Sequence, residues 1–428
     1  MTDLAHLPLD ETILATVTRI AQTAPVKVAL QQCVDEAEFA KGEQIRISEI
    51  PAPTFKESVR AEEIARLLRA YGLTDVVIDP IGNVVGRRPG TLGKKGPVLA
   101  MGAHMDTVFP EGTDVRVTEK DGAYYGPGLG DNASNLRSMM QILRALTEQK
   151  IQTQGDLLFV GTVGEEGNGD IRGVKALFDG SRHIDGFLAL DSSDVGRILY
   201  GATGSHRWRV TISGAGGHSY ADFGLIPSAI HAMGRAVAKI ADVEVPEEPK
   251  TTFSVGLIKG GTSVNTIAPS AVVDVDMRSV DNETLLKLEK TILETFHQAV
   301  AEENARWKVS DDEKKLRVSF EQIGSRPAGL RPVDCPVLQS ARSAQKVLGI
   351  PMTKYNCAST DANKPISLGI PATCLSSGGI GRGAHTLEEH FIFKDIHLGP
   401  QLALLTALAL VGTEDEAPIL PVLEKMPC

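Results

Sequence analysis

The chain contains little cysteine and few aromatic residues. Its 428 residues include 5 cysteines, and aromatic residues make up 5% of the sequence. The cysteines are odd in number, widely spaced and without a CxxC pair, which is typical of a reducing compartment. We therefore expect a protein that works in such a compartment.

Basic clusters and long apolar runs are also missing. Lys and Arg total 44 against 54 Asp and Glu, which gives a formal net charge of −10, and no basic run suggests a nucleic acid or an anionic membrane as partner. The longest apolar stretch, residues 402–411, is too short to span a bilayer, and the first 24 residues have no basic region leading into an apolar core. We expect a soluble, cytoplasmic protein that binds neither nucleic acid nor membranes.

What the chain does have is a repeated pattern: an apolar segment of strand length, a turn, and a candidate metal ligand. The segments and the residues that follow them are 98–103 with His104 and Asp106, 156–163 with Glu165 and Glu166, 186–190 with Asp191, and 372–375 with His385. In open α/β sheets, ligands bind outside the carboxyl ends of the strands. The pattern predicts that these side chains meet at one edge of a sheet.

Each candidate also has an ordinary structural explanation when taken alone. Asp131 precedes apolar residues at helical spacing, Leu136, Met139, Met140 and Leu143, so it could be a helix N-cap. Asp191 could cap a helix or turn, and Glu165 and Glu166 could form a solvated turn. Taken together, however, two imidazoles and several carboxylates could hold two divalent metal ions.

Six short motifs occur in a fixed order along the chain. They are GAHMDTV (102–108), GLGDN (128–132), GEEG (164–167), LD (190–191), GGHS (216–219) and GAHT (383–386). This order resembles the cocatalytic dizinc exopeptidases and amidohydrolases, a family that includes glutamate carboxypeptidase, tripeptidase T and aminoacylase. The resemblance runs from about residue 40 to the C-terminus. It implies an α/β catalytic domain, zinc-exopeptidase-like, with a mixed sheet flanked by helices.

The resemblance also implies the ligand set for two zinc ions. His104 would bind one zinc and His385 the other, Asp131 would bridge both, and Glu166 and Asp191 would complete the two shells. Neutral imidazole and carboxylate ligands suit zinc, although cobalt or manganese would accept the same set.

Two further carboxylates receive catalytic roles from the resemblance. Asp106 looks like the group that accepts the second ring N–H of His104 and fixes its tautomer. Glu165 would be the general base: it would take a proton from a water shared by the two metals, and the resulting hydroxide would attack an amide carbonyl.

The middle of the chain changes pattern and indicates an inserted domain. Strand and helix patterns at about 208–212, 227–240, 252–258, 271–276, 283–303 and 316–320 give a β-α-β-β-α-β order, typical of an α+β ferredoxin-like sandwich. We therefore divide the chain into a discontinuous catalytic domain, 1–203 and 321–428, and an inserted domain, 204–320. By resemblance the insert is a dimerisation or lid domain, so a homodimer is expected, with His218 binding the oxyanion in the partner's site.

Substrate contacts are assigned by resemblance to Asn265 and Arg278. Arg278 could grasp a terminal carboxylate, but an ordinary surface ion pair explains it equally well. Aspartate at position 191 resembles the peptidases of the family, whereas many deacylating relatives have glutamate. The hypothesis is a metallo-exopeptidase for di- or tripeptides; an N-acyl amino acid deacylase and a non-catalytic binding protein on the same scaffold are the alternatives.

Overall fold

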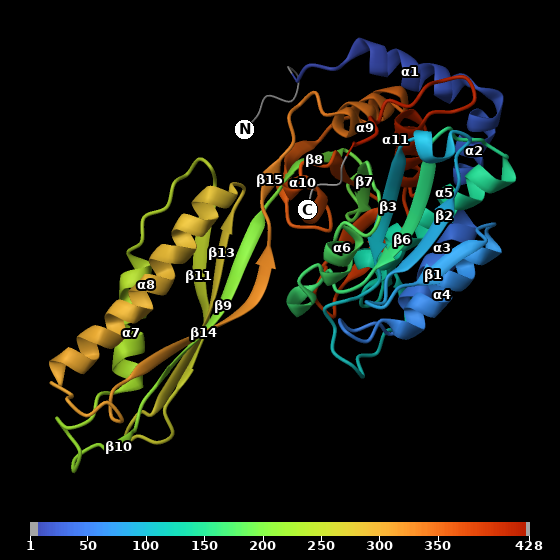
Figure 1. The fold of residues 1–428 in the computed structure, drawn as a ribbon. Helices are drawn as coiled ribbons and strands as arrows, with labels where there is room; N and C mark the ends of the chain where they lie inside the picture. Colours follow the sequence, from blue (N-terminus) through green and yellow to red (C-terminus); the bar gives the residue numbers. More distant parts are fainter. Residues whose placement is uncertain (1–6, 425–428) are drawn as a thin grey trace. The chain divides into compact units, whose positions relative to one another are not determined.

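The computed structural model describes residues 7–424, which fold into two compact units (Figure 1). The first unit comprises the described residues up to Ala202 and those from Leu330 onward; the second is Thr203–Gly329. The second unit extends beyond the predicted residue 320 because strand β14 (Arg317–Arg326) runs on past it.

A six-stranded mixed sheet forms the centre of the first unit. Its order is β1 (Asp75–Ile78), β2 (Val84–Arg88), β6 (Asp156–Thr162), β3 (Val98–His104), β7 (Gly186–Leu190) and β17 (Ala372–Leu375). The last four are parallel to one another, whereas β1 and β2 run antiparallel to their neighbours. These four are the strands predicted from the apolar segments, and the predicted mixed α/β fold is confirmed.

Alternate residues of the central strands face two separate hydrophobic cores. On one face Met101, Phe159 and Leu188 pack with α4 (Ser58–Ala70), α5 (Ser134–Glu148) and α11 (Leu398–Val411). On the other face Ala100 and Phe187 pack with α6 (Arg172–Leu177) and α10 (Asn363–Ser367). Burial on both faces explains why these strands read as continuous apolar runs.

The remaining elements of the first unit surround this sheet. They are α1 (Glu11–Gln22), α2 (Ala24–Asp35), α3 (Ala37–Ser48), β4 (Thr118–Lys120), β5 (Ala123–Tyr125), β8 (Arg197–Ala202), β15 (Gly329–Leu330, where the chain returns), α9 (Pro336–Val347), β16 (Lys354–Ala358), β18 (Ile380–Arg382) and β19 (His390–Ile392). Strands β18, β19, β5 and β4 form a small antiparallel sheet, which carries the glycine-rich loop of His385.

The second unit packs two helices on one antiparallel sheet. The sheet order is β11 (Thr251–Gly260), β13 (Ser270–Ser279), β9 (Gly204–Ser213) and β14, and the helices are α7 (Ala229–Ala241) and α8 (Asn282–Arg306). Helix α8 begins after Asp281, whose carboxylate accepts the N–H of Thr284 at 2.8 Å. The order β9-α7-β11-β13-α8-β14 is that of the ferredoxin-like sandwich expected from the sequence. Two short strands, β10 (Gly217–His218) and β12 (Thr266–Ile267), pair beside it.

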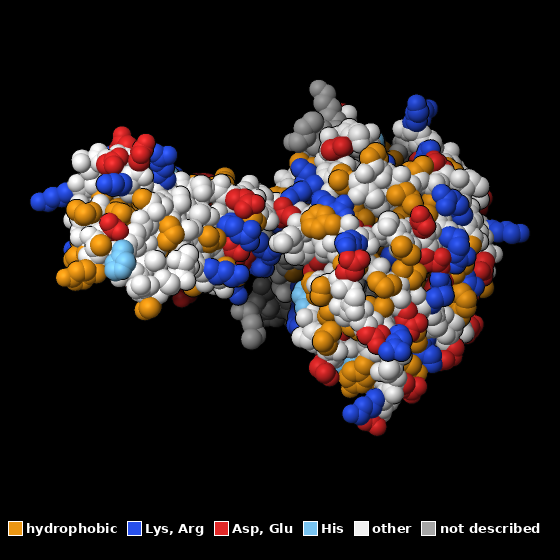
Figure 2. All heavy atoms as spheres, turned by 90° about the horizontal axis from the view of Figure 1, so that it is seen from below, with side chains coloured by type: hydrophobic (Ala, Val, Ile, Leu, Met, Phe, Trp, Pro, Cys, Tyr) orange, Lys and Arg blue, Asp and Glu red, His pale blue; other side chains and the backbone are white. Residues whose placement is uncertain are grey.

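On the face in Figure 2, basic and acidic side chains are interspersed. Among residues 7–424, no helix is both long enough and apolar enough to cross a membrane.

Candidate metal centre

Three parallel strands of the central sheet end beside the candidate ligands. His104 is the last residue of β3 and pairs in register with Thr162, the last residue of β6, so Glu165 and Glu166 follow at the same edge. Asp191 follows β7, and its N–H donates to the carbonyl of Leu375 at the end of β17. The predicted convergence at the carboxyl edge of the sheet is therefore observed.

Asp131 lies between the two histidines. His104 Nε2 is 3.0 Å from Asp131 Oδ1, and His385 Nε2 is 3.1 Å from Asp131 Oδ2. His385 Nε2 is also 3.0 Å from Glu166 Oε1. One ligand atom from each of His104, Asp131 and Glu166 lies within 4.8 Å of the others. The two imidazoles thus approach different oxygens of one carboxylate.

The backbone around Asp131 excludes the helix-cap explanation. Helix α5 begins only at Ser134, and its cap residue, Ala133, has no side chain that could accept a hydrogen bond. Asp131 has φ −114° and ψ 91°, which is not helical. Its carboxylate contacts the two imidazoles rather than the first turn of the helix.

The ionisation of these groups is coupled. Burial opposes a charge on the His104 ring, but the nearby carboxylates of Asp106 and Asp131 outweigh it and raise the pKa of His104 well above 6.5. Hydrogen bonds with Asp131 and Glu166 raise the pKa of His385 to about 10. Burial, and then the negative charge of Asp131, raises the pKa of Asp191 to about 7. Crowded carboxylates of this kind are stabilised by cations, so the residues fit a divalent metal site.

Asp106 makes contacts that differ from those expected. The Nδ1 of His104 lies 3.0 Å from the main-chain oxygen of Asp106, whereas the Asp106 carboxylate is 3.6 Å away. That carboxylate instead accepts the N–H groups of Glu165 and Glu166, at 2.9 and 3.0 Å, and the hydroxyl of Thr54 at 2.9 Å. Its side chain thus orders the Glu165-Glu166 turn, while its main chain orients the imidazole.

Glu165 and Glu166 do not form a solvated turn. Their exposed fractions are 5% and 6%, although three glycines and an asparagine surround them in sequence. Burial favours a carboxylate that either binds a cation or carries a proton.

Three buried polar residues hold the site together, and of these the sequence motifs include Asn132 but not Asn135 or Glu389. Glu389 accepts the N–H groups of Gly128, Gly130 and Asp131. Asn132 donates to the carbonyl of Leu190 at 2.9 Å, and Asn135 donates to Asn132 Oδ1 and to the carbonyl of Ser192. They fix the turn of Asp131 against the segment that carries Asp191. Asn135 lies inside a helical pattern and Glu389 lies in a charged stretch, so the sequence around these two residues gives no sign of a role in the site.

His218, Asn265 and Arg278 belong to the second unit. His218 is exposed on β10, and its Nδ1 accepts the N–H groups of Tyr220 and Ala221 at 3.2 and 3.3 Å. The carbonyl of Asn265 accepts the N–H of Ser219 at 3.0 Å. Arg278, on β13, donates through Nε to Asp276 at 2.7 Å, so an ion pair is present.

A cavity of about 340 Å³ opens beside the candidate ligands. Asp131, Asp191 and Glu389 line it together with Ser192, Ser193 and the segment Gly381–Ala384. His385, next to this segment, has φ 67°, a left-handed conformation that is costly for a residue other than glycine and is often found at functional sites. Of the five candidate ligands, Asp131 and Asp191 line this cavity.

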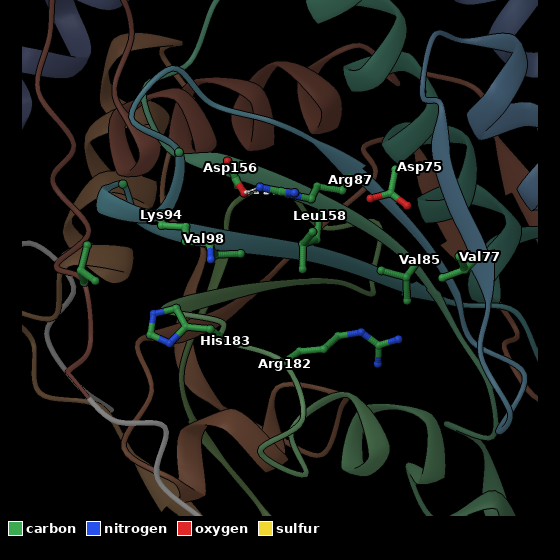
Figure 3. Close-up of a pocket in the computed structure, with 13 residues that line it drawn as sticks. Asp75, Val77, Val85, Arg87, Lys94, Val98, Asp156, Leu158, Arg182 and His183 are labelled. Atoms are coloured by element: carbon green, nitrogen blue, oxygen red, sulfur yellow. Dashed lines mark hydrogen bonds and ion pairs between the residues drawn. The ribbon is translucent and has the colours of Figure 1, made fainter.

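A larger cavity, of about 560 Å³, lies elsewhere in the first unit (Figure 3). Val85, Val98 and Leu158 form apolar walls, while Arg87 in that cavity is paired with Asp156 at 2.6 Å. None of the predicted site residues lines it. Size alone therefore does not identify the reactive site.

Two imidazoles around a shared carboxylate, at the carboxyl edge of an α/β sheet, form a candidate centre for divalent metal ions. The family model of "Peptidase family M20/M25/M40" matches residues 100–409, and the chain belongs to this family of metallohydrolases, which act on peptide and amide bonds.

Individual relatives within this family have different substrates. The succinyl-diaminopimelate desuccinylase of Hydrogenovibrio crunogenus is 27% identical over 344 residues, which cover 75% of this chain and 86% of the relative. A tripeptidase structure from Staphylococcus aureus has a TM-score of 0.72 and 25% identity, and covers 86% of this chain and 97% of that one. The aminopeptidase PepT structure from Bacillus cereus has a TM-score of 0.70 and 24% identity, with the same coverage.

Proposed function

We propose that the protein is a metallo-exopeptidase that hydrolyses short peptides, such as di- or tripeptides. The observation that carries the proposal is the approach of His104 and His385 to opposite oxygens of Asp131. The similarity to a tripeptidase supports peptide substrates. Aspartate at position 191 also supports them, because many deacylating members of the family have glutamate at this position.

Five side chains would hold two metal ions. His104 would bind one ion and His385 the other, Asp131 would contact both, and Glu166 and Asp191 would complete the sets. Zinc suits this mixture of imidazole and carboxylate, and cobalt or manganese would accept it as well. When bound, the metals would polarise the amide carbonyl and make a water molecule more acidic.

Glu165 is proposed as the general base. It is buried, and its backbone N–H is held by Asp106, so its position relative to Glu166 is fixed. In the reaction it would take a proton from the attacking water and return that proton to the leaving nitrogen. A carboxylate in a buried site can perform both steps.

His218 is proposed to stabilise the negative charge that develops on the carbonyl oxygen. Because backbone N–H groups donate to its Nδ1, the neutral ring carries its proton on Nε2. That N–H is a donor of the kind that binds an oxyanion. In a homodimer, His218 would serve the site of the second copy.

The homodimer is itself a proposal and is supported by an open sheet edge. β11 is an outer strand of the four-stranded sheet, and on it Ile258 is 58% exposed. Ile230 on α7 is 44% exposed. Exposed edge strands with apolar side chains tend to pair with another chain. Light scattering should give a dimer mass for the protein and a monomer mass for Ile258→Asp; a monomeric unmodified protein would exclude this proposal.

An N-acyl amino acid deacylase is the second candidate. Curated relatives that match most of the chain include a desuccinylase, which cleaves an amide formed by an acyl group rather than a peptide bond. The same ligands and the same base would serve that reaction. The two candidates differ only in which substrates the cavity admits.

The deciding experiment combines metal analysis with a substrate panel. Purified protein would be loaded with zinc and tested on di- and tripeptides and on N-acetyl and N-succinyl amino acids. We expect about two metal ions per chain and preferred hydrolysis of peptides; preferred hydrolysis of the acylated amino acids would select the deacylase. Metal-free protein that hydrolyses none of these compounds would favour a binding role.

A matched pair of variants tests the base. Glu165→Gln should reduce kcat by about 10²–10⁴-fold with the metal content unchanged, because it removes only proton transfer. Glu119→Gln, on the exposed strand β4, should match the unmodified protein. Full activity in Glu165→Gln would refute the assignment of the base.

A further inference from the structure

We propose that Arg382 binds a carboxylate of the substrate close to the amide that is cleaved. This inference deepens the proposed function and rests on it. It selects, among peptides and acylated amino acids, those that carry a negative charge near the reacting bond.

Arg382 is the single basic residue among those that line the cavity at the candidate ligands. The remaining lining residues are glycines, an alanine, the serines Ser192 and Ser193, and the carboxylates Asp131, Asp191 and Glu389. A substrate held there would meet the serine hydroxyls and one guanidinium. A guanidinium matches a carboxylate with two parallel N–H groups.

The side chain of Arg382 makes little contact within the protein. Its Nη1 lies 3.3 Å from the carbonyl of the adjacent Gly381, and within residues 7–424 no carboxylate lies within ion-pair distance of its guanidinium. Arg137 in the same unit is different: it is fully buried and donates to Gln141, Ile396 and Ser377. Arg137 is structural, whereas the guanidinium of Arg382 remains available to a ligand.

The backbone beneath Arg382 is held on two sides. β18 pairs with β19, with Arg382 opposite His390, and the N–H of Gly381 donates to Ser193 Oγ at 3.0 Å. A side chain at Gly381 would lie 3.2 Å from Ser193 Oγ, so this approach favours glycine. The base of Arg382 is thus fixed against the segment that follows Asp191, which limits how far the guanidinium can move from the site.

The carboxylate could lie on either side of the amide bond. On the leaving side it would be the C-terminal carboxylate of a dipeptide, and on the acyl side it would be a group such as the free carboxylate of a succinyl chain. Both present the same chemistry to Arg382. Matched substrates distinguish the two sources: dipeptides against dipeptide amides, and N-succinyl against N-acetyl amino acid amides.

The test compares Arg382→Gln with the unmodified zinc-loaded enzyme on these pairs. We consider the substrate pair of which the unmodified enzyme prefers the charged member. On this charged substrate, kcat/KM of Arg382→Gln should be about 10- to 100-fold lower than that of the unmodified enzyme, mainly through KM. On the neutral substrate of the pair it should be lower by less than about 3-fold. Arg382→Lys should recover part of the loss because it keeps the charge but not the planar fork. Arg66→Gln, an exposed arginine on α4, should change neither.

Three results would overturn the inference. The first is an equal fall in kcat/KM of Arg382→Gln on charged and neutral substrates, and the second is no fall on either. The third is a fall in kcat/KM that occurs only together with a changed circular dichroism spectrum or metal content. If the unmodified enzyme hydrolyses none of these compounds, the proposed function fails. Binding by Arg382 is then tested separately, by calorimetric titration of the unmodified protein and of Arg382→Gln with glycine amide, glycine and succinate. Tighter binding of an anion that Arg382→Gln abolishes would support the contact, and equal binding by both proteins would exclude it.

Discussion

The carboxylate of Glu389 accepts the backbone N–H of Asp131, with 3.0 Å between Oε1 and the nitrogen. The same oxygen accepts the N–H of Gly130 at 2.8 Å, and Oε2 accepts that of Gly128 at 2.9 Å. Glu389 is 1% exposed, and it comes from the segment between β18 and β19. A buried carboxylate thus fixes the turn that holds Asp131 between the two imidazoles.

Replacing Glu389 should loosen this turn. In Glu389→Gln one acceptor oxygen becomes an NH2 group that faces an N–H donor, which should cost about 1–3 kcal/mol of unfolding free energy. We expect weaker metal binding together with this loss of stability. Glu388→Gln, an exposed neighbour, is the control. Unchanged metal affinity and melting temperature in Glu389→Gln would show that the three hydrogen bonds do not position the turn.

The number of metal ions retained should depend on which ligand is removed. Asp131 contacts both imidazoles, whereas His385 contacts only Asp131 and Glu166 among the candidate ligands. Asp131→Ala should therefore lose both ions, and His385→Ala should lose one and keep the other more weakly. Elemental analysis after dialysis gives the ratio of metal to chain. Equal losses in the two variants would argue against a shared carboxylate.

The sequence predicted the framework of the site because that framework follows strand ends. Apolar runs end where the parallel strands leave the core, and His104 and Asp191 lie at or directly after those ends. The ferredoxin-like order of the second unit was also predictable, because its strands and helices each show a clear periodic spacing of apolar residues. Local sequence patterns thus predicted the helices and strands and their order along the chain.

The contacts between distant segments could not be predicted in this way. Glu389 lies between Glu388 and His390, and only the pairing of β19 with β5 carries it under the turn of Asp131. Asp106 was expected to hold the His104 ring through its carboxylate, but the tight turn after β3 brings its main-chain oxygen closer. Distances of this kind depend on tertiary packing and not on residue spacing.

Asp106 should therefore affect catalysis more than metal binding. In Asp106→Asn one side-chain oxygen becomes an NH2 group and can no longer accept an N–H from the Glu165-Glu166 turn. The main-chain oxygen that orients His104 is retained. We expect kcat to fall by at least about tenfold with little change in metal content, since small displacements of a base are costly. Loss of metal in parallel with activity would restore the role first expected for the carboxylate.

Metal removal should destabilise the first unit. A ligand that binds only the folded state at 100 times its Kd contributes about 2.7 kcal/mol per site. Chelation should therefore lower the melting temperature by several degrees, and added zinc should restore it. The chelator should have no such effect on Asp131→Ala, which provides the control. An unchanged melting temperature in the unmodified protein would mean that no tightly bound metal was present.

Stability of the second unit should depend on the charge of Glu303 on α8. Glu303 is buried and lies 2.9 Å from Arg235 Nε on α7 and 2.8 Å from Trp307 Nε1. Burial raises the pKa of Glu303, but the hydrogen bonds from Trp307 and Arg235 outweigh it and hold the pKa below its usual 4.5. Because the pKa is lowered in the folded state, the stabilisation is present above pH 4.5 and is lost as the pH falls through the folded-state value.

Glu303→Gln should consequently lower the unfolding free energy near pH 7 by about 1–3 kcal/mol. Its difference from the unmodified protein should shrink as the pH falls below 4.5. Trp208 and Trp307 are the two tryptophans of the chain and both lie in the second unit, so tryptophan fluorescence during urea unfolding follows this unit directly. Glu302→Gln, which changes only exposed contacts with Lys239 and Gln298, should stay within about 0.5 kcal/mol of the unmodified protein. A difference between Glu303→Gln and the unmodified protein that is constant from pH 7 to pH 4 would mean that packing, and not charge, accounts for it.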